Sequence, residues 1–437
     1  MTDPDLDALT AELDRAHVFH SWSAQGTLNP FVIAGGSGTR VWDHAGREFL
    51  DFSSQLVNVN IGHQHPAVVA AIHEQADLLT TIAPATANLA RGRAAQKIAE
   101  LAPAGMDKVF FTNGGADAVE NAVRLARLHT GRRKVMSTYR SYHGNTGAAI
   151  NATGDWRRLP NEFSTGHVHF FGPFAYRSEF WSTSPEQEGE RALQHARRIV
   201  EVEGPDSIAA ILIESIPGTA GVLVPPAGYL AGLRALADEY GIMLILDEVM
   251  AGFGRTGDWF AHTKHDVVPD LITFAKGVNS GYVPVGGVIM SNEIAASFDT
   301  RVFPGGLTYS GHPLATASIV ATIDAMRDEG VVEHAAAIGS DVLGPGLEKL
   351  AASHDVIGEV RGLGVFWALD LVADPQTRAP LPAAAMGRIK SELVARGLLP
   401  FIADNRIHVV PPCVVTADEV ASALAIYDEV LALVPSF

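Results

Sequence analysis

The sequence predicts an α/β fold, with a large domain built on a mainly parallel sheet and a smaller α+β domain at the C-terminus. Through the middle of the chain, short apolar runs alternate with amphipathic stretches, as they do where helices are layered on a parallel sheet. From about Val331 the pattern changes, because two long amphipathic segments there flank strand-like stretches. The composition agrees with this prediction: 437 residues, 47% hydrophobic and 19% charged, allow more than one domain and a large core.

The expected elements follow from hydrophobic periodicity. The strands of the large domain are expected at Lys108–Thr112, Lys134–Thr138, Ala209–Ile213, Met243–Leu246, Leu271–Phe274 and Gly286–Met290. Its helices are expected at Pro66–Leu79, Asp117–His129, Pro226–Tyr240 and His312–Asp328, with a surface loop at the Pro/Ser-rich stretch Ser182–Gly189. The small domain should contain helices at Ala383–Arg396 and Ala417–Leu433 and strands at Gly358–Leu371 and Arg406–Val410. We expect an N-terminal segment (1–60) that packs with the small domain, a large domain (61–330) and a small domain (331–437).

Charge and cysteine content exclude several classes of protein. A net charge of −17 and a pI near 5.4 argue against a nucleic-acid partner, which requires a basic face. Cys413 is the only cysteine, so the chain has no internal disulfide and no thiolate metal cluster. The N-terminus lacks the basic and then apolar pattern of a signal peptide, and runs such as Ile208–Ile213 are too short to span a bilayer. These features predict a cytoplasmic protein without membrane contact.

Two strand ends bring an acid and an amine toward one edge of the predicted sheet. Met243–Leu246 leads into Asp247 and Glu248, and Leu271–Phe274 ends two residues before Lys276. Ligands of such sheets bind beyond the carboxyl ends of the strands, so both side chains are placed to face one ligand. Pyridoxal phosphate requires this pair, a lysine that forms an imine and a carboxylate that keeps the pyridine nitrogen protonated. The alternative is a salt bridge beside a surface lysine, and Glu248 is most simply a structural acid, as is Glu120.

A strand that runs through glycines into a helix is a second feature, at Phe110–Asp117. Backbone N–H groups at a helix N-terminus, with no bulky side chains over them, form a phosphate site. Such turns also occur without a ligand, so this segment alone leaves both readings open.

Two further patterns resemble ligand sites but fail on their context. Gly252–Gly257 matches G-x-G-x-x-G, yet Asp247 and Glu248 stand between the strand and the glycines, and no helical periodicity follows. A dinucleotide site is therefore not expected. His63 and His65 lack a third ligand at metal-binding spacing, so we expect a turn that leads into a helix and no metal site.

The segment Asp247–Gly257, which reads DEVMAGFGRTG, together with Lys276 after Thr273-Phe274-Ala275, resembles the cofactor signature of the class III, or omega, aminotransferases. The resemblance extends from Trp42 to Pro412, and it implies the fold of the fold-type I pyridoxal-phosphate enzymes. It implies pyridoxal 5′-phosphate as cofactor, Lys276 as the residue that carries it as a Schiff base, and Asp247 at its pyridine nitrogen. It further implies cofactor contacts from Gly115, Ala116, Tyr142, His143, Glu214, Val249 and Thr308. Thr308 resembles a threonine that reaches the phosphate of the neighbouring subunit, which implies a homodimer.

The chain departs from the family's pattern where the substrate carboxylate is usually bound. His408 stands in place of one carboxylate-binding arginine, Ala417 in place of a flexible one, and Met250 in place of a glutamine near the cofactor's phenolic oxygen. Arg406 lies two residues from His408, on the same face if the segment is a strand, so we expect these two residues to share the substitute role. The alternative is that Arg406 pairs with a neighbouring acid, and that backbone donors or another arginine such as Arg157 bind the carboxylate. Trp22 and Val57 are expected to line the substrate pocket, with a core position as the alternative for each.

The function implied by the resemblance is transfer of an amino group from an amine, omega-amino acid or taurine-like donor to a 2-oxo acid, pyruvate being the expected acceptor, by a ping-pong mechanism. Residues 51–58 lean toward the taurine–pyruvate and beta-alanine–pyruvate members. An aminomutase or a decarboxylating transaminase is the alternative within the family. Outside it stand an NAD-dependent oxidoreductase and a cofactor-binding protein without catalysis.

Overall fold

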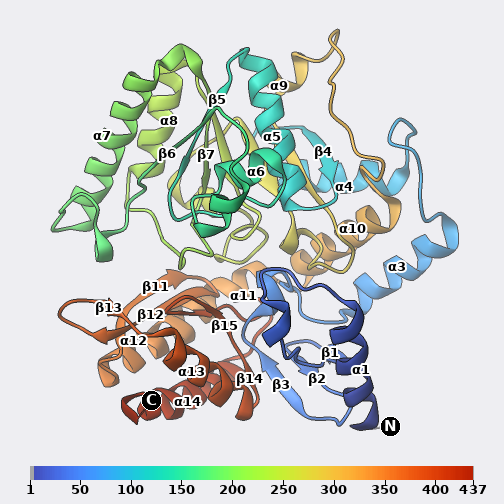
Figure 1. Ribbon diagram of the computed structural model, residues 1–437. Helices are drawn as coiled ribbons and strands as arrows, with labels where there is room; N and C mark the ends of the chain where they lie inside the picture. Colours follow the sequence, from blue (N-terminus) through green and yellow to red (C-terminus); the bar gives the residue numbers. More distant parts are fainter. Residues whose placement is uncertain (1–3, 437) are drawn as a thin grey trace.

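A seven-stranded sheet organises the large lobe of the computed structural model, which describes residues 4–436 (Figure 1). Its strands lie in the order β4 (Lys108–Thr112), β10 (Gly286–Met290), β9 (Leu271–Phe274), β8 (Met243–Asp247), β7 (Ile208–Glu214), β5 (Lys134–Thr138) and β6 (His167–Phe170). Neighbours from β9 to β6 pair in parallel, whereas β10 pairs antiparallel with both β4 and β9. The predicted α/β class with a mainly parallel sheet is confirmed.

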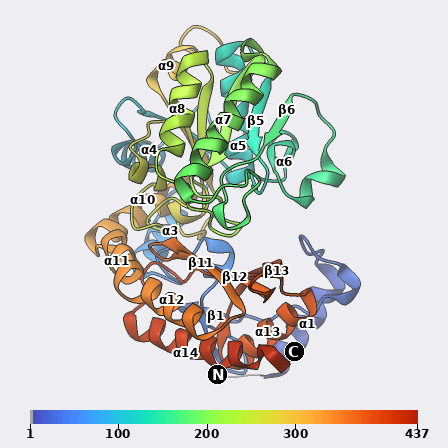
Figure 2. The same ribbon diagram turned by 90° about the vertical axis from the view of Figure 1, so that its left-hand side faces the viewer.

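Helices cover both faces of this sheet because successive residues of its buried strands point to opposite sides. On β7, Leu212 packs under α5 (Gly115–Thr130), whereas Ile211 packs under α7 (Pro185–Glu203) and α8 (Tyr229–Tyr240). Figure 2 shows α7 and α8 together on their side of the sheet, with α6 (Gly147–Ala152) elsewhere in the lobe. A third cluster joins the β4–β10–β9 end of the sheet to α4 (Leu89–Leu101) and α10 (Pro313–Asp328). Helices therefore pack on both faces of the sheet and hold the carboxyl ends of its strands in place.

The expected strands agree closely with the observed ones, and the helices less so. The bounds of β4, β5, β9 and β10 coincide with the prediction, and α3 (Pro66–Leu78) and α10 differ by one residue. The helix α8 begins three residues late because Gly228, at φ 81°, breaks the helical path. The predicted loop at Ser182–Gly189 is wrong: α7 begins at Pro185, and the Ser184 side chain accepts a hydrogen bond from the Gln187 N–H. The elements β6, α4 and α9 (Asn292–Ala296) were not expected from the sequence.

The small lobe combines helices with an antiparallel sheet. Its helices are α11 (Val331–Ile338), α12 (Gly344–Ser353), α13 (Ala383–Ala395) and α14 (Ala417–Leu433), and its strands are β11 (Ile357–Leu363), β12 (Phe366–Asp374), β13 (Ala379–Pro380), β15 (Phe401–Ala403) and β16 (Arg406–Val409). The stretch Gly358–Leu371, expected as strand throughout, is a hairpin of β11 and β12. Its turn includes Gly364 at φ 57°, a conformation that favours glycine.

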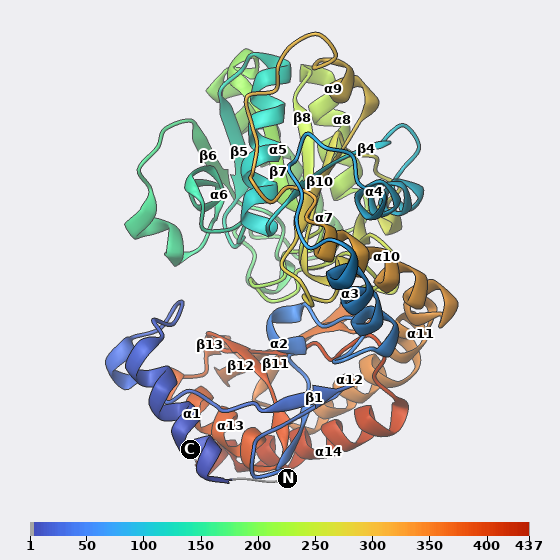
Figure 3. The same cartoon turned by 90° about the vertical axis from the view of Figure 1, so that its right-hand side faces the viewer.

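The N-terminal segment lies against the small lobe. After α1 (Pro4–His17), β1 (Gly35–Ser37), β2 (Arg40–Trp42) and β3 (Glu48–Asp51) form a sheet with β14 (Leu398–Leu399). The chain then passes through α2 (Ser54–Val57) to α3, which lies along α10 between the lobes (Figure 3). The boundaries at residues 60 and 330 stay a prediction. Within residues 4–436, no helix combines the length and the apolar character needed to cross a bilayer.

Candidate active site

Three adjacent strands deliver charged side chains to the carboxyl edge of the large sheet. Glu214 ends β7 and Asp247 ends β8, and these two residues are paired in register. Lys276 follows β9, the next strand of the sheet, at φ 47°. A left-handed conformation is uncommon for a residue other than glycine, and such positions cluster at functional sites. The parallel sheet thus brings together the acid and the amine that the sequence placed at strand ends.

Asp247 is buried and held from two sides. One carboxylate oxygen, Oδ2, lies 2.8 Å from Nδ1 of His143, and Oδ1 accepts a hydrogen bond of 3.0 Å from the Val249 N–H. His143 is itself buried, and Thr153 Oγ1 accepts a bond from its backbone N–H. The other ring nitrogen of His143 has no partner among the described residues. These two contacts fix the Asp247 carboxylate at the carboxyl end of β8.

Glu214 forms the neighbouring acid. Its two carboxylate oxygens accept hydrogen bonds from the N–H groups of Tyr142 and Gly218, at 2.9 and 2.8 Å. Burial raises the pKa of Glu214 to about 7; the charge of Asp247 adds to this effect, whereas His143 opposes it. Glu214 therefore connects the loop that carries Tyr142 to the loop that carries Gly218.

Lys276 has the properties of a nucleophilic amine. Burial lowers the pKa of its ammonium group to about 8. The charges of Asp247 and Glu214 oppose that shift, whereas those of Arg255 and Arg157 reinforce it. A substantial fraction of the amine is therefore neutral near physiological pH, as imine formation requires.

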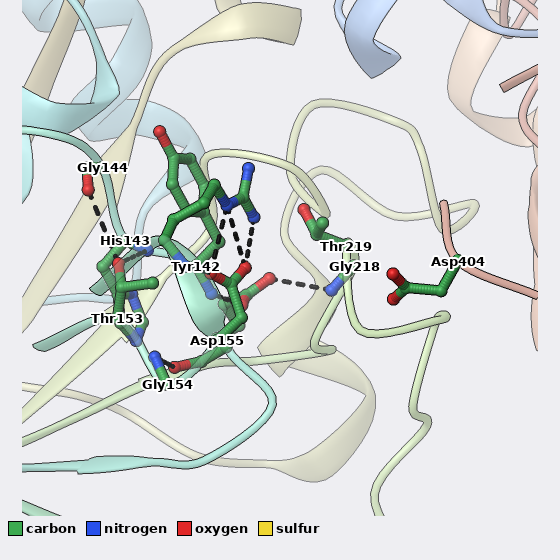
Figure 4. A network of polar contacts seen from close by, with 12 residues as sticks. Tyr142, His143, Gly144, Thr153, Gly154, Asp155, Gly218, Thr219 and Asp404 are labelled. Carbon is green, nitrogen blue, oxygen red and sulfur yellow. Dashed lines mark hydrogen bonds and ion pairs between the residues drawn. The ribbon is translucent and has the colours of Figure 1, made fainter. Parts of the chain in front are cut away.

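A cleft of about 910 Å³ opens above Lys276 between the two lobes, and its lining includes Trp22, Tyr142, Arg157, Met250, Lys276 and Arg406. Figure 4 shows Tyr142 and Asp155 on one side of this region and Asp404 on the other, with Gly218 and Thr219 between them. Met250 packs so closely on Gly218 that a Cβ there would lie 2.0 Å from its sulfur. The volume suits a cofactor together with a small substrate.

The large-lobe wall of the cleft carries a stacked arginine. The Arg157 guanidinium lies 3.7 Å from the centre of the Tyr142 ring, and Trp22 meets the same ring edge-on at 6.3 Å. Asp155 holds Arg157 through bonds of 3.0 and 3.1 Å to its Nε. Trp22 was expected to line the pocket and does so, with 55% of its surface exposed.

The small-lobe wall carries Arg406. Its Nη2 donates to Asp404 at 2.6 Å and to the Thr219 carbonyl at 3.4 Å, and its Nε has no partner among the described residues. Asp404 is largely exposed, with 67% of its side chain accessible, so water competes for this ion pair. An anion that enters the cleft therefore competes with a weak partner for this guanidinium.

His408 lies beside Arg406 but turns away from the cleft. It is fully buried, its Nε2 lies 3.0 Å from the Gly218 carbonyl, and it stacks on Phe401 at 4.6 Å. Burial, with the charge of Arg406 adding to it, lowers the pKa of His408 to about 3. The ring is therefore neutral, and we do not retain the expected sharing of a substrate carboxylate between His408 and Arg406.

Val57 is likewise a core residue, which is the alternative to its expected pocket position. It is 1% exposed and packs with Ile216, Phe366 and Val410, whereas the neighbouring Leu56 lines the cleft. The backbone of α2 is irregular here, with Ser54, Gln55 and Val57 at φ 44°, 62° and 58°. No sequence signal would have selected Leu56, because this irregular path overrides the regular alternation of faces.

The glycine-rich turn forms the other end of the site. Gly115 and Ala116 are the first residues of α5, so their N–H groups belong to the first turn, where helices lack internal acceptors. Val249 packs on this turn, since a Cβ at Gly115 would lie 2.8 Å from its side chain. Thr308 is exposed in the single chain, on the loop before α10.

These residues fit pyridoxal phosphate by the chemistry of their donors. Lys276 supplies a buried amine, Asp247 a buried carboxylate, and the α5 N-terminus a site for the phosphate. The glycine pattern at Gly252–Gly257 and the pair His63 and His65 lie in other settings. Only turns and a short 3₁₀ helix follow Gly252–Gly257, and the ring nitrogens of His63 and His65 meet Asp51 and Glu329. Residues 4–436 contain no group of three or more ligands placed to hold a metal.

Comparison with known proteins agrees with this site. A family model described as aminotransferase class-III matches residues 22–431. The chain is 34% identical over 404 residues to a taurine–pyruvate aminotransferase of Rhodobacter capsulatus, covering 88% of this chain and 87% of the relative. It is 32% identical over 407 residues to a putrescine–pyruvate aminotransferase of Pseudomonas aeruginosa, covering 89% and 88%. The structure of a taurine:2-oxoglutarate aminotransferase from Bifidobacterium kashiwanohense, in complex with PLP and glutamate, superposes with a TM-score of 0.94 at 42% identity, covering 98% of each chain.

Proposed function

Since this chain belongs to the class III aminotransferases, which depend on pyridoxal phosphate, we propose that it moves an amino group from an amine, omega-amino acid or taurine-like donor to pyruvate. The observation that carries the proposal is the position of Lys276. Its buried amine lies beside the carboxylates of Asp247 and Glu214, beneath a cleft with arginines on both walls.

The chain's residues divide the work of such a reaction. When bound, pyridoxal phosphate supplies an aldehyde carbon for imine exchange and a ring that withdraws electrons from the substrate carbon. Lys276 would hold the cofactor, release it to the incoming amine, and then move a proton at the substrate carbon with its freed amine. Asp247, fixed by His143 and the Val249 N–H, would keep the pyridine nitrogen protonated. Gly115 and Ala116 would bind the phosphate, while Tyr142 and Val249 would enclose the ring.

The acidic end of each substrate would meet a guanidinium. Arg406 can form two parallel hydrogen bonds with a carboxylate, and its exposed partner Asp404 is easily displaced. Arg157, stacked on Tyr142, offers a second cationic group on the opposite wall. A donor that lacks an acid group would use the same cleft with Trp22 as its apolar contact.

A second acceptor, 2-oxoglutarate, is favoured by one observation. Arginines stand on both walls of the cleft, so an acceptor with two carboxylates can engage both. The Bifidobacterium relative that shares 42% identity is named for that acceptor. Steady-state kinetics with pyruvate and with 2-oxoglutarate at the same donor concentration distinguish the two.

The working form would be a homodimer in the cytoplasm. Thr308 is exposed in the single chain, in keeping with the expectation that it reaches the phosphate of a second copy. The one cysteine, Cys413, is a buried free thiol, as suits a reducing compartment. Light scattering would test the dimer, and fractionation of the native cells would test the location.

The experiment is a screen of amine donors against the cofactor-loaded enzyme. Taurine, putrescine, beta-alanine and 5-aminovalerate are added singly without acceptor, and the bound cofactor's absorbance is followed. At least one donor should change the spectrum and yield its keto or aldehyde product, and pyruvate should restore the spectrum while forming alanine. A spectrum unchanged by every donor would contradict transaminase activity. Turnover beyond one equivalent of enzyme without any keto acid, with an isomer of the donor as product, would favour an aminomutase, and release of CO₂ a decarboxylating transaminase. Oxidation that requires NAD would favour the dehydrogenase reading.

A further inference from the structure

Arg255 is a fully buried arginine whose hydrogen bonds all end on neutral oxygens. It lies in the loop between β8 and β9 and has 0% of its surface exposed. Its Nη2 donates to Asn60 Oδ1 at 2.7 Å and to Ser54 Oγ at 3.2 Å. Its Nη1 donates to the carbonyls of Val365 and Pro411. One guanidinium thereby joins the large lobe, the N-terminal segment and the small lobe.

The positive charge of Arg255 has no ion-pair partner within residues 4–436. Asp51 attracts it from a distance, but that carboxylate is engaged with Ser53, Gln55 and His63. Arginine does not lose its proton in proteins, so the charge persists. A buried charge without a counter-ion costs several kcal/mol of stability. The hydrogen bonds that join the three segments would not by themselves require a charge, because neutral donors also hydrogen-bond to carbonyls.

The loop that carries Lys276 lies next to this charge. Asn60 binds Arg255 with its oxygen and donates with its Nδ2 to the Phe253 carbonyl at 2.7 Å. The same Nδ2 lies against Gly277, where a Cβ would be only 2.3 Å away. A single side-chain amide therefore separates the guanidinium from the residue that follows Lys276.

We infer that Arg255 is a positioning residue for Lys276: it fixes the loop of the catalytic lysine through Asn60, and its unpaired charge keeps the lysine amine neutral. The inference rests on the proposed function, since it assigns Lys276 the role of nucleophile and base. A fixed cation disfavours a second positive charge nearby, so the ammonium form of Lys276 releases its proton more readily.

The charges that face Lys276 support this assignment. After burial, which is the largest cause, the pKa of Lys276 is raised by Asp247 and Glu214 and lowered by Arg255 and Arg157. Arg157 is paired with Asp155, so part of its field is cancelled locally. Arg255 is the cation of this set without such a partner, and it offsets the two carboxylates.

The test compares Arg255→Met with Arg255→Lys in the cofactor-loaded dimer. Both variants lose the forked hydrogen bonds, but only Met loses the charge. In the loaded enzyme the Lys276 nitrogen is the one bonded to the cofactor, and the rate of the amine half-reaction should rise with pH as that nitrogen loses its proton. In Arg255→Met the pH at which this rate rises should be higher by about half to one unit, because removal of a nearby charge shifts a pKa on that scale. In Arg255→Lys it should stay within about 0.2 units of the wild-type position.

A spectroscopic readout makes the test independent of turnover. The pH at which the bound cofactor's absorbance changes should shift in the Met variant and not in the Lys variant. A second pair covers the case in which Arg255→Met does not fold. Asn60→Asp places a carboxylate beside the guanidinium and should shift both readouts upward, whereas Asn60→Ala loses the same amide donors without adding charge and should shift neither.

The inference would be overturned if Arg255→Met and Arg255→Lys had the same pH profile, or if Asn60→Asp and Asn60→Ala did. Arg255 would then have only a structural role, that of holding the three segments together. Failure of the proposed function looks different. In that case the wild-type enzyme itself shows no amine-dependent change of spectrum, so there is no half-reaction whose pH dependence could shift.

Discussion

The floor of the cleft and its walls are built on different principles. The floor, defined as Glu214, Asp247 and Lys276, stands at the ends of three adjacent strands, and its carboxylates are buried and hydrogen-bonded. The walls, defined as Trp22, Arg157 and Arg406, stand on the N-terminal segment, on a short 3₁₀ helix of the large lobe and on the small lobe. Their arginines are held by acids of the protein that an incoming anion can replace. Chemistry is thus placed by the sheet, and recognition by segments that can change without disturbing it.

The largest expected effect of any change to the floor is that of Lys276→Ala. Turnover should be abolished, because both the attachment of the cofactor and the proton transfer are lost, while the fold persists. Donor-dependent product formation measures the activity, and circular dichroism serves as the control for folding. Near-normal activity in a variant that retains the cofactor's absorbance would show that Lys276 is not the catalytic lysine.

Asp247→Asn should have the next largest effect. An amide cannot hold the pyridine nitrogen protonated as an ion pair, so the half-reaction should slow by several powers of ten, each equivalent to about 1.4 kcal/mol of barrier. Cofactor binding should survive, and single-turnover absorbance measurements separate the two properties. A decrease of less than about tenfold would place the protonation of the ring under another residue's control.

Thr308→Ala tests whether the cofactor site is complete within one chain. Loss of one hydrogen bond to a charged phosphate should weaken cofactor binding by about 1.5–3 kcal/mol, measured by equilibrium titration. Mixing this variant with Lys276→Ala subunits should rebuild one intact site in each heterodimer, so that activity rises at limiting cofactor. Absence of recovery after verified subunit exchange would assign Thr308 to its own subunit's site or to none.

Arg406→Ala is the corresponding test of the walls. The KM for pyruvate should rise by about tenfold to a hundredfold, since a hydrogen bond to a charged group contributes about 1.5–3 kcal/mol. The half-reaction with a neutral donor such as putrescine should remain unchanged, in contrast to any change to the floor. Arg157→Ala, assayed in parallel, shows which wall binds the acceptor. If both half-reactions fell together with stability, Arg406 would be a structural residue of the small lobe.

The smallest effect is expected for Asp404→Asn, which removes the exposed partner of Arg406. Exposed ion pairs contribute about 0–1 kcal/mol, so freeing Arg406 should lower the KM for pyruvate by no more than about fivefold. The direction of the change is the informative part. A higher KM would indicate that Asp404 holds Arg406 in its binding position.

Several elements could be predicted because their signal is local. The strands β4, β5, β9 and β10 are short apolar runs with clear ends, and burial between helix layers requires such runs. The predicted loop differs from the observed start of α7 because Ser184, Pro185 and Glu186 resemble a polar loop, although serine followed by proline is also a helix start. The sequence pattern predicts one continuous strand where the structure has the hairpin of β11 and β12, because the turn between them is only two residues long.

The sequence by itself determined the chemistry: the residue types at the strand ends, their spacing, and the family they resemble. Only the tertiary structure decided which side chains face the cleft. The left-handed residues of α2 turn Val57 into the core and Leu56 outward, and the short distance to Gly218 turns the neutral His408 away from the cleft. The position of Arg255, with its charge beside the loop of Lys276, likewise depends on three distant segments meeting. Strand ends are governed by local pattern, whereas the direction of a side chain is settled by long-range packing that one-dimensional periodicity does not contain.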